Sequence, residues 1–420
     1  LDFPGEQLIS QVEVEIGGQR IDRQYGDWMH IWNQLTLSKE QEPGYNKMVG
    51  HTTALTYLTD TNFAAVDGPC EGASAANVCT PRNALPETTL YVPLQFWYCR
   101  NPGLALPLIA LQYHEVKINL DLRPIDECLF ARSAEDTEDT TQTGKSLVAA
   151  SLYVDYVFLD TDERRRMAQN PHEYLIEQLQ FTGDESIGSS SNKIKLNFNH
   201  PCKELVWVVQ PDANVAYCDS YGNGKATQAV YGAQSFNYTD DLDALPNSML
   251  AFGTNDSLAS GGAFLQSNGD LFNDWKATEA SGDTDDDGVY VSDAGSFVLG
   301  EAALNMHCWG ENPVVTAKLQ LNGQDRFSER EGTYFDLVQP YQSHTRSPDT
   351  GINVYSFALR PEEHQPSGTC NFSRIDNATL QLVVSNATVK GDETAKVRVY
   401  ATNYNVLRVM SGMGGLAYSN

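Results

Sequence analysis

Apolar and polar residues alternate in short runs along most of the chain, and glycine, proline or asparagine bounds most of these runs. A period of two turns one face of each run toward a core and the other toward solvent, so the runs predict β-strands. The predicted strands are residues 11–16, 88–96, 114–122, 151–159, 174–181, 193–198, 204–210, 317–322, 354–359, 379–384 and 395–401. Many strands with few helical stretches indicate an all-β chain of antiparallel sandwiches or barrels.

The clearest helical stretch covers residues 160–170. Asp160 or Thr161 can accept hydrogen bonds from the first free amides of a helix, and Glu163 suits its positive N-terminal end. Pro171 prevents the helix from continuing. We therefore predict a short helix that links two strand-rich halves.

Two stretches of the chain are similar to each other. Residues 12–29 align with residues 317–335 with one inserted residue, and in both an alternating strand leads into a Gly-Gln turn. Glycine permits a tight turn, and the following segment carries an aromatic residue that can pack under the sheet. The other shared positions are Arg20 with Arg326, Ile21 with Phe327, Gly26 with Gly332 and Trp28 with Tyr334. A weaker match pairs residues 106–120 with 368–382, so we expect two copies of one β-domain.

The two copies differ in what precedes them. Three predicted strands between residues 174 and 210 precede the second copy, whereas the first copy begins at residue 12. We expect two tandem eight-stranded jelly rolls, a double jelly roll, of which the first lacks its N-terminal strands, so residue 1 is not expected to be the biological start. The expected domains are 1–160, a linker helix at 161–170, and 171–420 with a long acidic loop insertion at 211–312.

The composition is that of a packed globular protein, with 41% hydrophobic and 10% aromatic residues. Its 55 acidic and 28 basic residues give a formal charge of −27, which disfavours direct binding to nucleic acid or to anionic lipid. The longest apolar stretch, residues 104–111, is interrupted by proline and is too short for a membrane span. We therefore expect no direct contact with nucleic acid and no membrane insertion.

Residues 211–312 hold about half of the net charge, since they contain sixteen acidic and two basic residues. A segment this long without sustained periodicity is usually a functional surface or disordered. We expect it to rise from one end of the second domain as a solvated, acidic loop.

One string within this loop has the alternating oxygen donors that Ca²⁺ requires: Asp283, Asp285 and Asp287, with Asp293 following. However, Ala294 occupies the position of the final glutamate of an EF-hand loop, and no flanking helices are evident. A solvated acidic loop is therefore favoured over a Ca²⁺ site.

The chain carries no recognisable catalytic motif. A GKS string at residues 144–146 lacks the upstream glycine of a phosphate-binding loop, and there is no GxSxG elbow and no HExxH helix. Eight cysteines occur without a CxxC pair, which argues against a zinc ribbon. Cys70 and Cys79 are the only close pair, and whether they form a disulfide is left open. We expect no enzyme activity and no cofactor.

Five Asn-x-Ser/Thr sites are present. Asn237 and Asn255 lie in the acidic loop, where a glycan would be tolerated, and are the candidates for N-glycosylation. Asn377 and Asn386 flank a predicted strand and are more often side chains that cap turns. Asn371 is the fifth site.

Several longer strings resemble a known family. They are EIGGQRID at 15–22, NPGLALPLIALQYHEVK at 101–117, PHEYLIEQLQFTG at 171–183, LNGQDRF at 321–327, QPSGTCNFSRIDNATL at 365–380 and YNVLRVMSGMGGLAYSN at 404–420. Together they resemble the major capsid protein of the nucleocytoplasmic large DNA viruses, closest to the type found in viruses of algae. The resemblance implies a double jelly roll that forms a homotrimer, a pseudo-hexagonal capsomer tiling an icosahedral shell.

On this resemblance the chain is a structural protein of the virion, assembled in the infected host cell, with neighbouring capsomers and minor capsid proteins as partners. The apolar, proline-broken loop carrying Leu104, Leu106, Leu108 and Ile109 is a candidate subunit contact, or else it covers the end of its own domain. The alternatives are a secreted or surface carbohydrate-binding β-sandwich and a glycoside hydrolase on a β-scaffold. Nothing in the sequence singles out a carboxylate pair for the latter.

Overall fold

The computed structural model describes residues 2–56, 85–128, 147–215, 234–240, 310–391 and 393–418. Its strands are β1 (Ile9–Ile16), β2 (Gln19–Tyr25), β3 (Val116–Leu122), β4 (His172–Ile187), β5 (Ser191–Leu196), β6 (Pro201–Pro211), β7 (Val314–Leu321), β8 (Gln324–Asp325), β9 (Arg330–Glu331), β10 (Asn353–Ser356), β11 (Cys370–Asn371), β12 (Ala378–Val384), β13 (Ala395–Met410) and β14 (Met413–Leu416).

The helices of the described residues are short. They are α1 (Pro4–Leu8), α2 (Gly26–Thr36), α3 (Glu42–Val49), α4 (Thr53–Thr56), α6 (Trp97–Arg100), α7 (Ile125–Cys128), α8 (Thr161–Gln169), α9 (Asp212–Val215) and α14 (Gln339–Ser343), with 3-10 turns η3 (Pro102–Leu104), η4 (Leu108–Ala110) and η9 (Phe372–Arg374) and a π-helical turn η8 (Tyr334–Val338).

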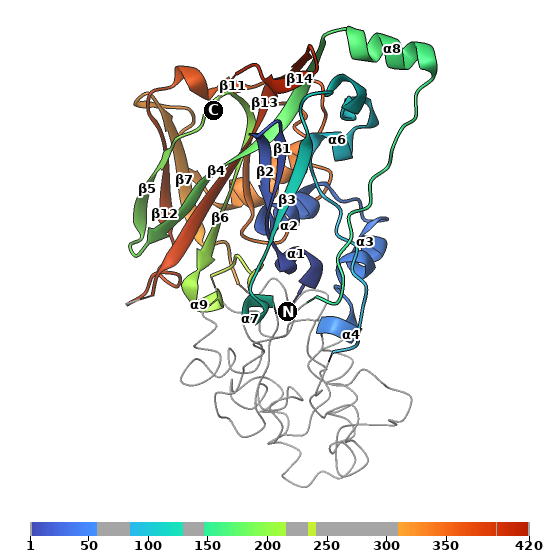
Figure 1. The fold of residues 1–420 in the computed structure, drawn as a ribbon. Helices are drawn as coiled ribbons and strands as arrows, with labels where there is room; N and C mark the ends of the chain where they lie inside the picture. The colour runs from blue at the N-terminus through green and yellow to red at the C-terminus, as the bar shows by residue number, and fades with distance from the viewer. Residues whose placement is uncertain are drawn as a thin grey trace, which may run out of the picture.

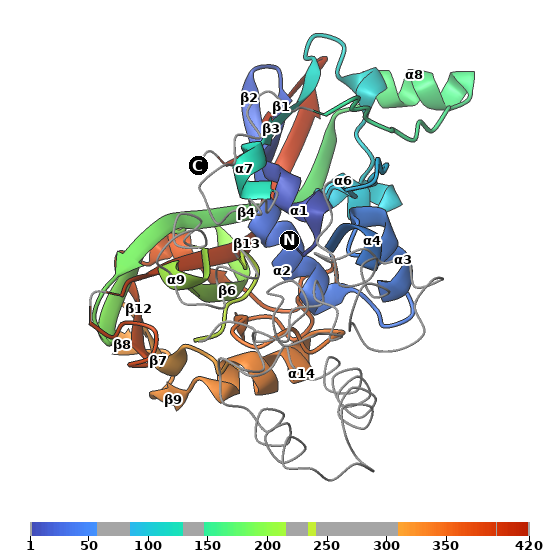
Figure 2. The same cartoon turned by 90° about the horizontal axis from the view of Figure 1, so that it is seen from below.

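The second half of the chain forms a two-layer sandwich. One sheet has the order β10-β6-β13-β14, with β4 also paired to β13 and β11 to β6, and the other has the order β5-β12-β7-β8, with β9 paired to β7. All of these pairs are antiparallel. Figure 2 shows β12, β7 and β8 beside β6 and β13. The core between the layers includes Trp207, Leu319, Phe335, Leu380 and Val397, each at most 1% exposed.

The first half contributes a separate three-stranded sheet of order β2-β1-β3. This sheet packs on the far ends of two long strands, β4 and β13, which continue past the second sandwich (Figure 1). Ile176 from β4 and Leu407 and Val409 from β13 therefore share a core with Val12 and Val14 of β1. The two halves are joined because the same two strands supply side chains to both cores.

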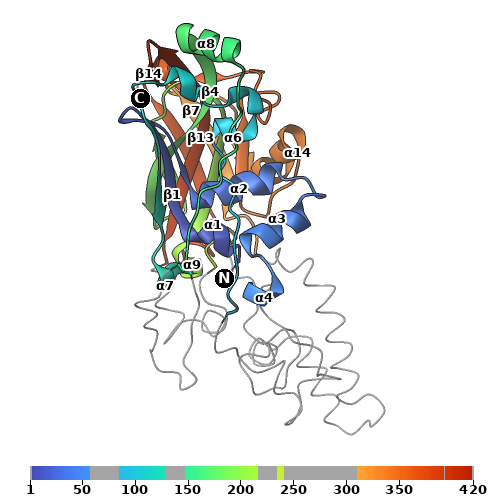
Figure 3. The same ribbon diagram turned by 45° about the vertical axis from the view of Figure 1, so that its right-hand side comes forward.

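Helix α2 fills the space between the halves. Its Trp28, Ile31 and Trp32 pack on the outer face of the β6-β13 sheet, against Val206 and Tyr400. Strand β6 is thus buried on both faces, which explains why its central residues 205–209, LVWVV, form a continuous apolar run instead of an alternating one. Figure 3 shows α2 and α3 along one side of the strands.

The predicted internal repeat is present in three dimensions. Gly17 and Gly18 in the first copy, and Asn322 and Gly323 in the second, all have positive φ, between 52° and 83°. Positive φ at both central residues is the signature of a type I′ hairpin turn. The third strand is also equivalent, because β3 pairs with β1 as β12 pairs with β7.

Gly26 and Gly332, which occupy equivalent positions in the two copies, both lie too close to a backbone carbonyl for a side chain. A Cβ on Gly26 would lie 2.1 Å from the carbonyl oxygen of Ile9, and one on Gly332 would lie 1.8 Å from that of Val314. Ile9 and Val314 are the first residues of β1 and β7. Each copy therefore needs glycine where the chain leaves the hairpin and crosses the start of its own first strand.

The predicted linker helix is α8, and the capping prediction is confirmed. The Asp160 side chain accepts from Thr161 N at 2.7 Å, and Glu163 completes a capping box by accepting from Asp160 N at 3.2 Å. None of its residues is buried. In Figure 1 the helix projects from the upper end of the molecule, whereas α4, α7 and α9 lie at the lower end.

Two of the predicted strands pair with no other strand among the described residues. Residues 88–96 and 151–159 run without a strand partner among the described residues, so their backbone pairing was wrongly predicted. An alternating pattern indicates which side chains could be buried, but a strand also needs a neighbour that accepts its hydrogen bonds. In the C-terminal region the prediction was too short. The predicted strand at 395–401 extends to Met410 as β13, and β14, which was not predicted, follows it.

Candidate assembly site

A buried ion cluster lies where the two halves meet. Glu177 on β4 is within 2.9 Å of Lys203 Nζ on β6 and 3.2 Å of Arg100 Nη1 on α6. Lys203 also lies over the Tyr404 ring and Arg100 over the Trp32 ring. Lys203 is 1% exposed, so neither charge of its pair could be removed without leaving the other buried. Arg100 comes from the first half, and the cluster thus fixes the first half to β4 and β6.

A second ion network joins the halves at α2. Asp27 in its first turn pairs with Arg123 Nη2 at 2.7 Å and with Arg398 Nη1 on β13 at 3.0 Å. Arg398 Nε also pairs with Asp184 on β4 at 2.9 Å. Burial would lower the pKa of Arg398, but the nearby Asp27 carboxylate raises it above its ordinary value. The guanidinium thus holds α2, β4 and β13 in one arrangement.

A third cluster anchors the chain after α14 to β6. The His344 ring lies 3.0 Å from Glu204 Oε2 and 2.9 Å from Glu362 Oε1, and its side chain has no exposed area. Burial alone would lower the pKa of His344, but the two carboxylates raise it to about 9. Burial opposes ionisation of Glu204, yet the charge of His344 keeps the pKa of this carboxyl below its ordinary value. The pair is therefore charged at neutral pH.

Asp22 on β2 is a buried carboxyl without a basic partner in hydrogen-bond contact among the described residues. It accepts from Leu179 N at 3.0 Å and from Gln24 Nε2 at 3.3 Å. Burial raises the pKa of Asp22 to about 7, and these hydrogen bonds offset part of that rise. Its position at the contact between β2 and β4 makes it a further join between the halves.

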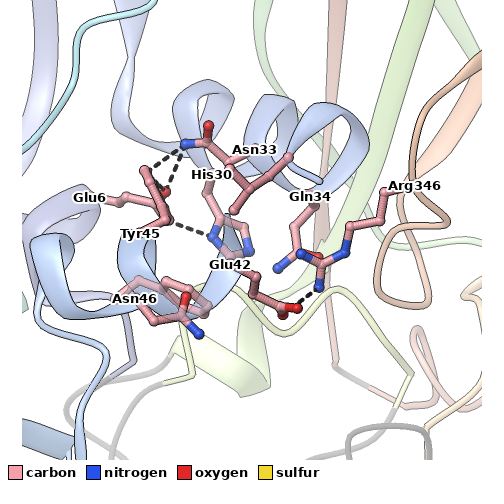
Figure 4. A pocket seen from close by; sticks show the side chains of 10 residues that line it. Glu6, His30, Asn33, Gln34, Glu42, Tyr45, Asn46 and Arg346 are labelled. Atoms are coloured by element: carbon pink, nitrogen blue, oxygen red, sulfur yellow. Dashed lines mark hydrogen bonds and ion pairs between the residues drawn. The ribbon is translucent and has the colours of Figure 1, made fainter. Parts of the chain in front are cut away.

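A small pocket between α1, α2 and α3 is lined mostly by polar side chains, with Phe3 and Leu37 as its apolar members (Figure 4). Glu6 accepts from Tyr45 Oη at 2.5 Å and from Asn33 Nδ2 at 3.0 Å, and it lies 2.7 Å from His30 Nδ1. Burial beside this carboxylate raises the pKa of the Tyr45 hydroxyl. Through these contacts Glu6 on α1 joins α2, which carries His30 and Asn33, to α3, which carries Tyr45. At the pocket's other side Glu42 pairs with Arg346 of the second half at 2.9 Å.

An extended apolar segment, residues 147–158, crosses from the lower end of the molecule to α8 (Figure 1). Val148, Tyr153, Val157 and Phe158 are 78–93% exposed, which is unusual for large apolar side chains. On β3, Leu120 and Leu122 are 47% and 43% exposed. We call residues 147–158 the apolar segment. Residues 147–158 have no strand partner among the described residues, and an extended apolar segment without a partner can serve as a template for pairing with another strand.

The predicted contact loop is only partly exposed. Leu104 and Leu106 pack partly buried against the first core, which is the role of a cover for their own domain. Leu108 in η4 is 46% exposed, and Ile109 next to it is half-buried. Helix α8 packs against η4. The loop therefore presents Leu108 to solvent while its other leucines face inward.

The remaining candidate residues are placed as follows. The Ca²⁺ candidates Asp283, Asp285, Asp287 and Asp293, the sequon at Asn255, and Cys70 and Cys79 lie outside the described residues. Asn237 is half-buried, and its amide donates to Gln234 Oε1 at 2.8 Å while its Oδ1 accepts from Thr239. A glycan at Asn237 would require this arrangement to open.

The sequence reading missed the buried charges that join the halves. Lys203 and Glu204 directly precede the apolar run of β6, and charges adjoining such a run are the signal that could have found them. Within the described ranges, no group of three or more His, Cys, Asp or Glu side chains could hold a metal ion. No helix there is long and apolar enough to cross a membrane.

Comparisons with known proteins agree with this architecture. Residues 163–415 match the family model for the large eukaryotic DNA virus major capsid protein, and residues 3–160 match that for the major capsid protein N-terminus. The chain is 75% identical to the major capsid protein of Phaeocystis pouchetii virus, over all of this chain and 82% of the relative. It is 70% identical to that of Chrysochromulina ericina virus, over all of this chain and 80% of the relative.

A solved structure is similar as well. A chain of the quasi-atomic model of the PBCV-1 virus capsid superposes with a TM-score of 0.60 at 34% sequence identity, covering all of this chain and 85% of that one. These neighbours confirm the double jelly roll, and they do not favour a carbohydrate-binding protein. The chain belongs to the major capsid protein family of the large eukaryotic DNA viruses, and it is a structural protein of the virion's capsid.

Proposed function

We propose that three copies of this capsid protein associate into a pseudo-hexagonal capsomer. The observation that supports this is the duplicated unit, since one chain contains both hairpin β1-β2 with β3 and hairpin β7-β8 with β12. Three such chains around a threefold axis would present six similar sandwiches. A capsomer with nearly sixfold edges can be surrounded by six others, and such blocks tile a flat facet.

The rigid connection of the two halves supports the same proposal. A pseudo-hexagon requires a fixed angle between the two units, and the shared strands β4 and β13 with the ion pairs of Glu177 and Asp27 provide it.

We also propose the domain limits 1–160, 161–170 and 171–420, with 211–312 as the acidic insertion. Helix α9 begins the proposed acidic insertion and lies at the lower end of the molecule in Figure 1. We therefore propose that this end faces outward, where negative charge keeps particles apart.

We propose Leu108 and Ile109, with Leu104 and Leu106 behind them, as part of the contact between subunits or with minor capsid proteins. Leu108→Glu should shift the protein from trimer to monomer, because a carboxylate would be buried without a partner. Leu359→Glu is the matched control, since Leu359 is an exposed leucine outside this loop.

The experiment is light scattering of the purified protein at several concentrations, with images of the particles. A threefold mass with a hexagonal outline is expected. A dimer or an open series of larger species would contradict the trimer. If Leu359→Glu dissociates the particle as much as Leu108→Glu does, the loop at 104–109 is not the contact.

A further inference from the structure

Two cysteines face each other across an antiparallel ladder in the second unit. Strand β11 pairs with β6 so that Cys370 lies opposite Cys202, and Asn371 opposite Pro201. The pairing continues one residue further, where Phe372 N donates to His200 O at 3.0 Å. Both thiols are free in the structure. No other two of the described cysteines face each other across a ladder.

The positions of the two residues suit a covalent bond. Residues directly opposite in an antiparallel pair have Cα atoms about 4.5–5.5 Å apart and side chains on the same face of the sheet. Disulfides join Cα atoms about 4.4–6.8 Å apart. Both side chains belong to the same hydrophobic core, Cys202 fully buried and Cys370 partly buried against it. A bond could therefore form by side-chain rotation with little movement of the backbone.

We propose that Cys202 and Cys370 form a cross-strand disulfide under oxidising conditions. The oxidant is a low-molecular-mass disulfide such as oxidised glutathione. The Cys370 thiolate attacks it, forming a mixed disulfide and releasing one glutathione. The Cys202 thiolate then attacks the Cys370 sulfur and releases a second glutathione, and the two cysteine protons pass to the two glutathione thiolates. Two thiols are oxidised to one disulfide, and the reagent is reduced to two thiols.

The surroundings set the order of the two attacks. Burial raises the pKa of both thiols, and the proximity of Cys370 raises that of Cys202 further. Arg326 acts in the opposite direction on Cys370, the more exposed of the two. Cys370 is therefore the entry point, and the reaction is slow in a reducing cell interior and proceeds after exposure to an oxidising medium.

The bond would close the edge of the second sandwich. Strand β11 is two residues long and ends the stretch that follows β10, where Gly368 crosses the carbonyl of Phe357. Linking it to β6 would tie this stretch to the central sheet. Since the bond removes freedom from the unfolded chain, the oxidised protein should unfold at a higher temperature.

The test uses the full chain, incubated with oxidised glutathione or with dithiothreitol, then digested without reduction and examined by mass spectrometry. A peptide pair joining Cys202 and Cys370 is expected only after oxidation, with a rise in thermal midpoint of about 5 °C. Cys370→Ser should abolish the peptide pair and the rise, whereas Cys99→Ser should leave both intact.

Cys202→Val is a second variant that keeps the core apolar, and it should also abolish the linked peptide. The proposal is overturned if Cys370 carries only glutathione after complete reaction, if both thiols remain free, or if either residue links to a different cysteine. The readout does not depend on oligomeric state, so it is separate from the trimer proposal.

Discussion

The two copies of the repeat have nearly the same third strand but different surroundings. Leu120 and Leu122 on β3 correspond by register to Leu382 and Val384 on β12. The first pair is 47% and 43% exposed, whereas each residue of the second pair is 1% exposed. The difference arises because a complete second sheet covers β12, whereas the ends of β4, β13 and β14 cover part of β3. An apolar pattern therefore predicts which side chains can be buried, and the packing of a second sheet determines whether they are.

Lys203→Met addresses the place where the two units meet and should have the largest effect. The substitution would leave the buried Glu177 carboxylate without its nearest cation, so the free energy of unfolding should fall by about 3–5 kcal/mol. Denaturant unfolding measures it. Lys195→Met, at an exposed position on β5, is the control and should change stability by less than about 0.5 kcal/mol. Equal effects of the two variants would contradict the role of the cluster.

His344 tests the buried His–carboxylate cluster that anchors the chain after α14 to β6 in the second unit. With a folded pKa of about 9 against an ordinary 6.5, His344 gives its full stabilisation below pH 6.5 and loses it as the pH rises through 9. The loss should be about 3 kcal/mol. His344→Gln should flatten this part of the pH profile of thermal unfolding. His172→Gln is the control, since His172 bonds the Met167 carbonyl instead of a carboxylate; an unchanged profile in His344→Gln would refute the assignment.

Gly26→Ala and Gly332→Ala test whether the two copies use glycine for the same reason. In either variant the new Cβ would collide with a carbonyl oxygen at the start of the hairpin. The free energy of unfolding should therefore fall by about 2 kcal/mol in each. Similar losses of stability would support a shared steric requirement for glycine in the two copies. An unchanged free energy of unfolding in either variant would contradict it. Gly44→Ala, where no atom lies within 4 Å of the new Cβ, should be neutral or slightly stabilising in helix α3.

A substitution in the apolar segment should have the smallest effect on the free energy of unfolding, and its main effect should be on the binding of a hydrophobic dye. Val157→Asp changes a 78% exposed side chain, so the free energy of unfolding should change by less than about 0.5 kcal/mol. Binding of a hydrophobic fluorescent dye should fall, because the segment is a large exposed apolar surface of the first unit. Tyr341→Asp, at an 83% exposed aromatic outside the segment, should reduce dye binding less. The reverse order would contradict the assignment.

Much of the fold could be predicted from local patterns. Nine of the eleven predicted strands overlap observed ones, and the linker helix begins directly after Asp160, one of the two capping residues that the sequence indicated. The repeat was readable because its turns and glycines are local requirements of the backbone. The buried ion clusters were not predicted, since Glu177, Lys203 and Arg100 lie far apart in sequence and meet through three different elements. The opposition of Cys202 and Cys370 likewise depends on strand register.

The sequence by itself determined the β-class of this protein, its duplicated hairpin and its family, because alternation, turn residues and long family strings are properties of short stretches. The tertiary structure decided which apolar faces are covered. It also decided that β4 and β13 contribute to both cores, and that residues 151–159 run without a strand beside them in the part of the chain that the structure describes. These outcomes depend on which distant segment arrives as a neighbour, and the free energy of burying a strand face exists only after that neighbour is in place.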